Sequence, residues 1–371
     1  FECTKSDQCD EGHAVKYATY GQAASNRDGA LTLKYARDVG FSGCTVRNVG
    51  NYGVELVYGC QGFFFEKGEI CHTGAGGIKA LGVGVAGNER DVNTGIRVED
   101  CSIHDCTLVD YGAIGIFIAH GNGIRLAHND IYNLKYSGIS VGWVWGMTPA
   151  RTGNAVIEYN HIHHRGDGDM SDMGGIYLWG PQVGTEVRGN YIHDIHRANY
   201  GGWGIYLDEG STGILVERNV VYDCDTSSFM IHYGTENIVR YNIFGEGKDA
   251  CVCIGAAVNY DTIYATMMKN IFYYTGKSAV YNGAFNVTLD FPILATDCNF
   301  FYRPDNTPLY NLVDPKEVPA FHQSFDTWRF MGNDVFSKEY PAGERLTAVP
   351  AELKAFGVPD VDAAYAGRRK G

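Results

Sequence analysis

The chain has 371 residues, 45% of them hydrophobic and 20% charged, so it is long enough to bury a large core and its composition excludes a disordered polypeptide. The formal net charge of −13 disfavours a nucleic-acid partner, because affinity for phosphates comes from clustered Lys and Arg. No run approaches the roughly 18 apolar residues of a membrane span, so no membrane partner is expected.

Residues 1–30 form an N-terminal segment that precedes the repeats. The segment opens with FECTKSDQCD, which has no initiator Met and no signal-like apolar stretch. We therefore interpret the chain as a processed or excised part of a longer polypeptide, and other segments of that polypeptide are expected partners.

Residues 31–305 contain a repeat of three short elements. One begins with Asn, followed two places on by Ile, Val or Phe; another is Gly-flanked, as in GGWGIYLDEG; a third precedes the Asn, as in TEVRGN. Three strands per period and no helical period predict an all-β fold, a right-handed parallel β-helix with three strands per rung. The repeated Asn residues are Asn129, Asn160, Asn190, Asn219, Asn242, Asn270 and Asn299.

These Asn residues are expected to form a ladder along the coil. Each side-chain amide can hydrogen-bond the amide one rung away, and Asn tolerates the left-handed backbone conformation that a sharp turn between strands needs. Earlier rungs have Cys44, Gly68 and Cys101 in the ladder position.

Beyond residue 305 the repeat gives way to DNTPLYNLVDPKEVPAFHQ and a tail that contains PAELKAFG. The open end of a β-helix is an exposed sheet edge that needs cover. We therefore predict that residues 306–371 form an irregular C-terminal cap and tail.

The stretch GGWGIYLDEGS, residues 201–211, places an acid at the end of a strand. Strand alternation sends Ile205 and Leu207 into the coil and leaves Tyr206 and Asp208 on the outer face. Aligning the rungs on their inward apolar pairs places more side chains on this face: Tyr177 and Trp179 one rung before, and Met230 and His232 one rung after.

A second acid, Asp172, lies just upstream of the strand in the preceding rung. Rungs are roughly 4.8 Å apart, so Asp172 and Asp208 can approach the roughly 5 to 5.5 Å between the carboxyl groups of retaining glycosidases. One acid would attack the anomeric carbon and the other would protonate the leaving oxygen. The alternative is that Asp-Glu-Gly is an ordinary turn sequence.

Aromatic and polar side chains near these two acids are candidates for binding a sugar, because aromatic faces pack on its C–H surfaces and polar groups bind its hydroxyls. No Cys pairs have zinc-like spacing, so neither a metal nor a cofactor is predicted. Histidines after the Asn ladder are expected to be solvated or to line the site. The substrate-binding candidates are Trp179, Tyr177, Tyr206, His232, Glu209, Trp143, Trp203 and His164.

The motifs together resemble glycoside hydrolase family 141, whose described activities include α-L-fucosidase and xylanase. The resemblance spans roughly residues 30–300. Its specific part is the pair SDMGGIY and GGWGIYLDEG, and further support comes from AGGIKALG, YSGISVGWVWG, YNHIHHRGDGDMSDMGGIYLWG, GNYIHDI and HYGTENIVRYNIF.

The resemblance implies that Asp208 and Asp172 are the catalytic aspartates. The chain departs from the family where MIHYG replaces HQHYG, which puts Met230 in place of a polar residue. It also departs at ACVCIGAA, where the family has a polar or acidic strand. Both changes would alter a sugar subsite.

The sequence therefore predicts a glycoside hydrolase that cleaves a complex polysaccharide, α-L-fucoside or xylan-like, with retention of configuration. A secreted or periplasmic location is expected. The alternatives are a non-catalytic carbohydrate-binding or structural β-helix protein, and a polysaccharide lyase. A lyase would need a Lys or Arg base, often with Ca²⁺, and the outer columns around Asp208 hold neither basic residue.

Overall fold

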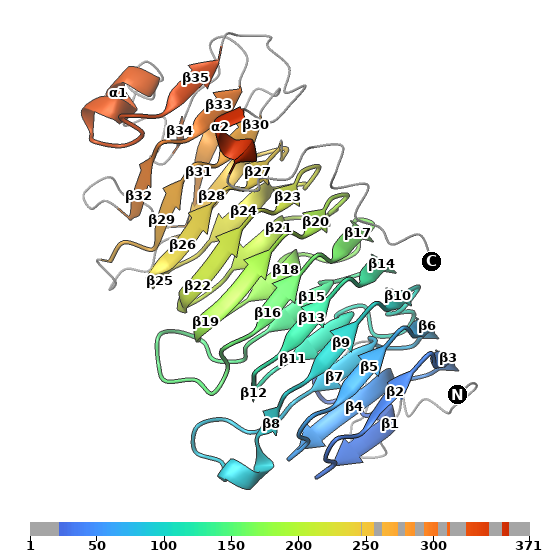
Figure 1. Cartoon of the computed structure of the whole chain (residues 1–371). Helices are drawn as coiled ribbons and strands as arrows, with labels where there is room; N and C mark the ends of the chain where they lie inside the picture. The colour runs from blue at the N-terminus through green and yellow to red at the C-terminus, as the bar shows by residue number, and fades with distance from the viewer. Residues whose placement is uncertain are drawn as a thin grey trace.

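The computed structural model describes residues 22–245, 247–255, 262–273, 279–285, 293–302, 310–311, 324–340 and 351–355. In these residues the chain winds into an elongated coil of stacked parallel strands, with the first strands at one end and the last at the other (Figure 1).

Three long parallel sheets form the faces of the coil, and we name each after its first strand. The β1 sheet comprises β1 (Gly29–Lys34), β4 (Tyr52–Tyr58), β7 (Ile78–Ala80), β11 (Ile116–Ile118), β15 (Ile139–Val141), β18 (Met173–Leu178), β21 (Gly202–Leu207), β24 (Ser227–Ile231), β28 (Ala250–Gly255), β31 (Ala279–Phe285) and β34 (Tyr310–Asn311). The β2 sheet comprises β2 (Gly40–Ser42), β5 (Phe64–Glu66), β9 (Arg97–Glu99), β13 (Arg125–Ala127), β16 (Val156–Glu158), β19 (Pro181–Arg188), β22 (Ser211–Glu217), β26 (Asn237–Arg240), β29 (Ala265–Met268) and β32 (Leu294–Asp297), with β25 (Gly234–Thr235) beside β22. The β3 sheet comprises β3 (Thr45–Val49), β6 (Glu69–Thr73), β10 (Ser102–His104), β14 (Asp130–Leu134), β17 (His161–Arg165), β20 (Tyr191–Ile192), β23 (Val220–Val221), β27 (Ile243–Phe244), β30 (Ile271–Tyr273), β33 (Phe300–Tyr302) and β35 (Lys338–Tyr340).

The remaining elements are short. They are the 3₁₀ helix η1 (Glu89–Asp91), the paired strands β8 (Asn93–Thr94) and β12 (Gly121–Asn122), and the helices α1 (Phe325–Phe330) and α2 (Ala351–Lys354). Neither α-helix within the described ranges has the length and apolar character of a membrane crossing. The expected all-β parallel β-helix with three strands per rung is confirmed.

The predicted Asn ladder is present and buried. The Nδ2 atom of Asn129 donates to Oδ1 of Asn160 at 2.9 Å, and the same oxygen accepts the backbone N–H of Asn129 at 3.1 Å. This pattern repeats from rung to rung as far as Asn299. The side chains thus satisfy backbone groups at a buried turn, which would otherwise be costly to leave without partners.

The left-handed backbone conformation at this turn belongs to the residue before each Asn, which corrects the sequence-based expectation. Tyr159, Arg218 and Lys269 have φ values of 53°, 56° and 56°, whereas the Asn residues that follow them are not in this region. The preceding residue makes the bend, and the Asn side chain is then aimed along the coil axis toward its neighbours.

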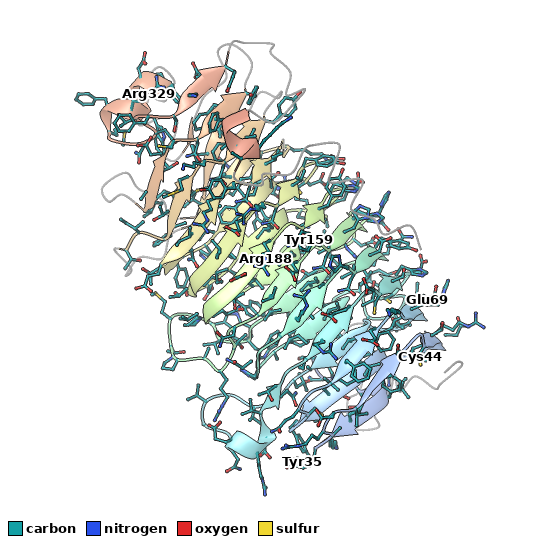
Figure 2. All side chains as sticks on the ribbon, in the orientation of Figure 1. Tyr35, Cys44, Glu69, Tyr159, Arg188 and Arg329 are labelled. Atoms are coloured by element: carbon teal, nitrogen blue, oxygen red, sulfur yellow. The ribbon has the colours of Figure 1, made fainter. Side chains whose placement is uncertain are left out.

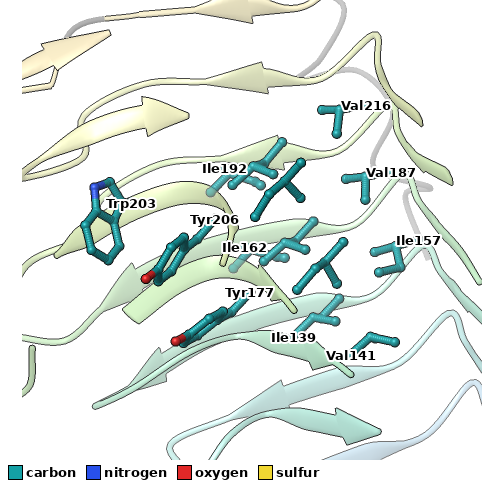
Figure 3. Close-up of a cluster of buried hydrophobic side chains, with 14 of the residues drawn as sticks. Ile139, Val141, Ile157, Ile162, Tyr177, Val187, Ile192, Trp203, Tyr206 and Val216 are labelled. Carbon is teal, nitrogen blue, oxygen red and sulfur yellow. The ribbon is translucent and has the colours of Figure 1, made fainter. Parts of the chain in front are cut away.

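Aliphatic columns fill the interior of the coil, as the alternation of β-branched residues dictates. Ile139, Ile176 and Ile205 lie in register on successive strands. Figure 3 shows other aliphatic side chains of this interior, such as Ile162 and Ile192. Arg165 interrupts another column at the position that Leu134 takes one rung earlier. Its guanidinium nitrogens have no hydrogen-bond partner among the described residues, and burial lowers the pKa of Arg165 to about 9.

The coil continues past residue 305, since β34 and β35 extend the β1 and β3 sheets into the segment assigned to the cap. The residues around α1 end the Asn ladder. The backbone N–H of Asn299 donates to Oγ of Ser337 at 2.7 Å, and its Nδ2 donates to the buried Asp334 at 2.9 Å. Trp328 of α1 donates its indole N–H to the same carboxylate.

Candidate active site

Asp208 begins the turn that follows β21, and the residue is only 5% exposed. Leu178, Leu207 and Ile231 are in register across β18, β21 and β24, so the residues after them share one column. This confirms the predicted alignment of Trp179, Asp208 and His232. The turn is tight: a Cβ at Gly210, which has φ +76°, would meet the carbonyl oxygen of Gly146 at 2.1 Å.

Each oxygen of the Asp208 carboxylate has a partner from a neighbouring rung. The hydroxyl of Tyr177 donates to Oδ2 at 2.6 Å, and Nδ1 of His232 lies 3.0 Å from Oδ1. The carboxylate is therefore fixed in orientation from both sides of its rung.

Asp172 precedes β18 and has φ +57°, a left-handed conformation that Asp tolerates better than most residues. Its backbone is held by the hydroxyl of Tyr136, which donates to the Asp172 carbonyl at 2.7 Å, and by the carbonyl of Tyr200 at 3.1 Å. Burial and the charge of Asp208 raise the pKa of Asp172 to about 6, although a hydrogen bond with Tyr206 acts in the opposite direction.

Tyr206 connects the two acids. Both acids act on the Tyr206 hydroxyl and Asp208 acts on Asp172, so the three groups interact across two consecutive rungs. Burial and the charges of Asp208 and Asp172 raise the pKa of Tyr206 well above its usual range, so this hydroxyl keeps its proton. The ring stacks on Tyr177 at 4.4 Å, and in Figure 3 both hydroxyls point away from the aliphatic interior.

The aromatic residues expected to meet the substrate directly are buried, which corrects the prediction of an open sugar-binding face. Tyr177, Tyr206, Trp179 and Trp203 are at most 3% exposed. Trp179 packs against Tyr177 at 4.8 Å and Trp203 against Tyr206 at 4.2 Å. Their rings stabilise the acid pair by packing, and aromatic pairs of this kind contribute about 0.5 to 1.5 kcal/mol each.

The stretch that follows β15 brings two tryptophans over this cluster. Trp143 and Trp145 lie 5.1 and 4.8 Å from the ring of Trp179, and the indole N–H of Trp179 donates to the carbonyl of Gly142. Trp143 is half-buried, whereas Trp145 is 49% exposed. An exposed aromatic face is therefore available beside the acid pair.

Glu209 and His232 stay partly exposed, and His164 lies elsewhere. Glu209 accepts a hydrogen bond from the hydroxyl of Tyr233 at 2.9 Å. His164 is on β17 of the β3 sheet, where its ring contacts His163 and His193. The structure therefore does not bring His164 together with the acids.

Three residues of the site were not predicted as site residues. Tyr136 and Tyr200 hold the Asp172 backbone, and Nε2 of Gln22 lies 3.2 and 3.5 Å from the hydroxyls of Tyr136 and Tyr177. The register that pairs Ile139 with Ile176 would have been a signal for Tyr136. Gln22 had none, because it precedes the first strand of the coil.

The outer column becomes apolar one rung after Asp208. Met230 is in register with Tyr206, and Cys253 follows on β28; both are buried. The two sequence departures therefore lie next to each other on the same face, on the side of the acid pair toward the C-terminus.

Comparison with known proteins identifies the coil. Residues 29–169 and 149–290 match the model of a family described as "Right handed beta helix region". No curated protein matches the chain.

Solved structures similar to the chain include a glycoside hydrolase (21% identity, TM-score 0.49, 65% of this chain and 38% of that chain). Others are the periplasmic alginate epimerase AlgG (14%, 0.49, 68% and 56%) and the GH136 lacto-N-biosidase from Eubacterium ramulus (12%, 0.49, 85% and 60%). The chain spans less than two thirds of each of these structures.

Proposed function

The chain belongs to the right-handed β-helix family, and from this premise we propose that it is a glycoside hydrolase acting on a complex polysaccharide. One observation carries the proposal: the carboxyl groups of Asp172 and Asp208, from consecutive rungs, interact with each other and with the Tyr206 hydroxyl. Two nearby carboxyl groups in different environments are what glycosidic bond cleavage requires.

The different environments of Asp172 and Asp208 assign a catalytic role to each acid. Asp172, whose pKa is raised to about 6, keeps a proton in mildly acidic solution and donates it to the leaving oxygen. Asp208, oriented by Tyr177 and His232, attacks the anomeric carbon and forms a glycosyl ester. Water then hydrolyses the ester, with Asp172 accepting its proton. The spacing of roughly 4.8 Å between rungs supports this retaining route over an inverting one.

The first substrates to test follow from the resemblance to glycoside hydrolase family 141, namely α-L-fucosides and xylan. Trp145 and Tyr200, about half exposed, are the aromatic surfaces we assign to sugar binding, with His232, Glu209 and Trp143 beside them. A secreted or periplasmic location would give the chain access to such polymers.

The burial of the aromatic cluster favours one second candidate, a non-catalytic β-helix that binds carbohydrate or serves a structural role. In that case Tyr177, Tyr206 and Trp179 would be core residues and the acids a remnant. A lyase fits less well, because the charged groups that act on the pKa of Asp172 are Asp208, Glu209 and His232, rather than a Lys or Arg base.

The test uses wild type, Asp172→Asn, Asp208→Asn and a control, Asp167→Asn, which alters an acid in the same loop whose partner is Lys135. Released sugar is quantified from α-L-fucosides, xylan and aryl glycosides with good and poor leaving groups. Asp172→Asn should retain activity mainly on good leaving groups, which need no acid, and Asp208→Asn should lose activity on all. Absence of hydrolysis by the folded wild-type chain would favour the non-catalytic alternative.

A further inference from the structure

A chain of His and Asp side chains occupies the outer face of the β3 sheet, on different strands from the acid pair. Asp130 begins β14, His161 and His163 lie on β17, and His193 and Asp194 follow β20. Glu69, which is labelled in Figure 2, lies in the same column two rungs earlier than Asp130.

The side chains form a continuous series of contacts. Nδ1 of His193 lies 2.6 Å from Asp194, and its Nε2 lies 2.8 Å from Nε2 of His161. Nδ1 of His161 lies 2.9 Å from Oδ1 of Asp130, and the same oxygen lies 3.1 Å from Nε2 of His163. Nδ1 of His163 in turn meets Nδ1 of His164.

When protons are assigned to the ring nitrogens of this series, one close contact of Asp130 is left without a hydrogen. The Asp194 carboxylate accepts, so Nδ1 of a neutral His193 carries the proton and its Nε2 accepts from His161. Nδ1 of His161 is then unprotonated, and its lone pair faces the Asp130 carboxylate. Two electron-rich atoms at this distance repel each other unless a positive charge lies with them.

We propose that a divalent first-row transition ion, such as Zn²⁺ or Co²⁺, binds between Asp130, His161 and His163. Their ligand atoms lie within 4.8 Å of one another. Ligands about 2.0 to 2.1 Å from a tetrahedral ion are roughly 3.3 Å apart, close to the two distances made by Asp130. Two His and one carboxylate with open positions are a known ligand set for such ions.

The surrounding residues support this assignment. With the ion bound, His161 donates Nε2–H to His193, which Asp194 orients, and His163 donates Nδ1–H to His164. Metal-bound His residues usually donate their second ring N–H in this way. Cys spacing, on which the expectation of no metal rested, does not reveal this site; the signal is His at alternate positions of one strand, in register with Asp one rung earlier.

The test is a Co²⁺ titration, read by visible absorption, of tag-free full-length protein dialysed against a chelator. Every variant carries Cys71→Ser, because Glu69, Cys71 and His104 form a second group of metal-ligating side chains. One ion should bind per chain. Asp130→Asn, which keeps the size of an exposed side chain, and His161→Gln/His163→Gln should abolish that binding.

Two further variants distinguish a specific metal site from nonspecific binding of Co²⁺ to His side chains. Asp194→Asn touches no ligand atom and should weaken Co²⁺ about 10- to 100-fold through His193. His128→Asn, whose ring stacks on Tyr159 outside this series, should bind as the parent does. Absence of binding by the parent protein, or binding unchanged by Asp130→Asn, would overturn the proposal and leave an imidazolium as the charge beside Asp130.

Discussion

The β1 and β2 sheets both carry carboxylates of successive rungs on their outer faces, but with different neighbours. On the β2 sheet, Glu158 lies between Arg125 and Arg188, and Nε of Arg188 lies 2.7 Å from its carboxylate. Burial alone would raise the pKa of Glu158, yet the two guanidinium groups lower it. On the β1 sheet, burial and the charge of the neighbouring Asp208 together raise the pKa of Asp172 to about 6.

The comparison shows that rung spacing alone does not make a catalytic pair. A parallel β-helix places side chains of adjacent rungs close together on every face. Burial favours the protonated form on both faces, and the sign of the neighbouring charge then either reverses that effect or adds to it. The first case describes the β2 sheet, and the second describes the acids beside Tyr206.

The largest expected difference between the two faces is in activity. Asp172→Asn should reduce hydrolysis of glycosides with poor leaving groups about 10²- to 10⁴-fold, because it removes the proton donor. Glu158→Gln should leave the rate near that of wild type. Initial rates on a common substrate test both variants, and equal losses in the two would remove the functional distinction between the faces.

The free energy of unfolding should change in opposite directions when Asp172 and Glu158 are replaced. The folded chain holds the Asp172 proton up to about pH 6, against 3.8 for the ordinary group, so the unfolding free energy falls as pH rises through that window. At pH 7, Asp172→Asn should therefore stabilise the fold by up to about 3 kcal/mol. Glu158→Gln, which weakens bonds to two Arg groups, should destabilise it by about 1 kcal/mol. Urea denaturation measures both.

Arg165 extends the comparison to a charge without a partner among the described residues. Arg165→Leu restores the side chain found one rung earlier and removes a buried guanidinium. The unfolding free energy should increase by about 1 to 3 kcal/mol. A decrease would indicate that the guanidinium has a compensating partner, such as an internal water or anion.

The pH dependence of activity tests whether Asp172 is the proton donor, and the effect expected here is smaller than those above. Because Asp172 must be protonated to act, kcat/KM should decline as pH rises past about 6. Glu209→Gln removes one of the charges that raise the pKa of Asp172, so the declining limb should move to lower pH. A limb that stays in place would assign the titration to another group.

Much of this arrangement could be predicted from local pattern. Alternation around Ile205 and Leu207 was sufficient to place Asp208 between Trp179 and His232, since a slip of one residue would turn the apolar pair outward. The recurring Asn predicted the ladder because every rung presents the same turn to the next.

The parts that escaped prediction depend on contacts that strand alternation does not encode. The burial of Tyr177 and Tyr206 follows from ring packing and from the Trp143–Trp145 stretch, which crosses over a neighbouring rung. The His and Asp series also joins side chains of different rungs. His164 was predicted to lie near the acids because it is close to Asp172 in the sequence, but it belongs to a strand of the β3 sheet.

The most direct test of the central claim is the pKa of the Asp172 carboxyl group, measured by ¹³C NMR in the wild type and in Asp208→Asn. Coupling between carboxyl groups of consecutive rungs predicts a value near 6 in the wild type and a lower value in the variant, where the charge of Asp208 is gone. An ordinary wild-type value near 3.8, unchanged in the variant, would contradict the claim that the two aspartates act as a pair.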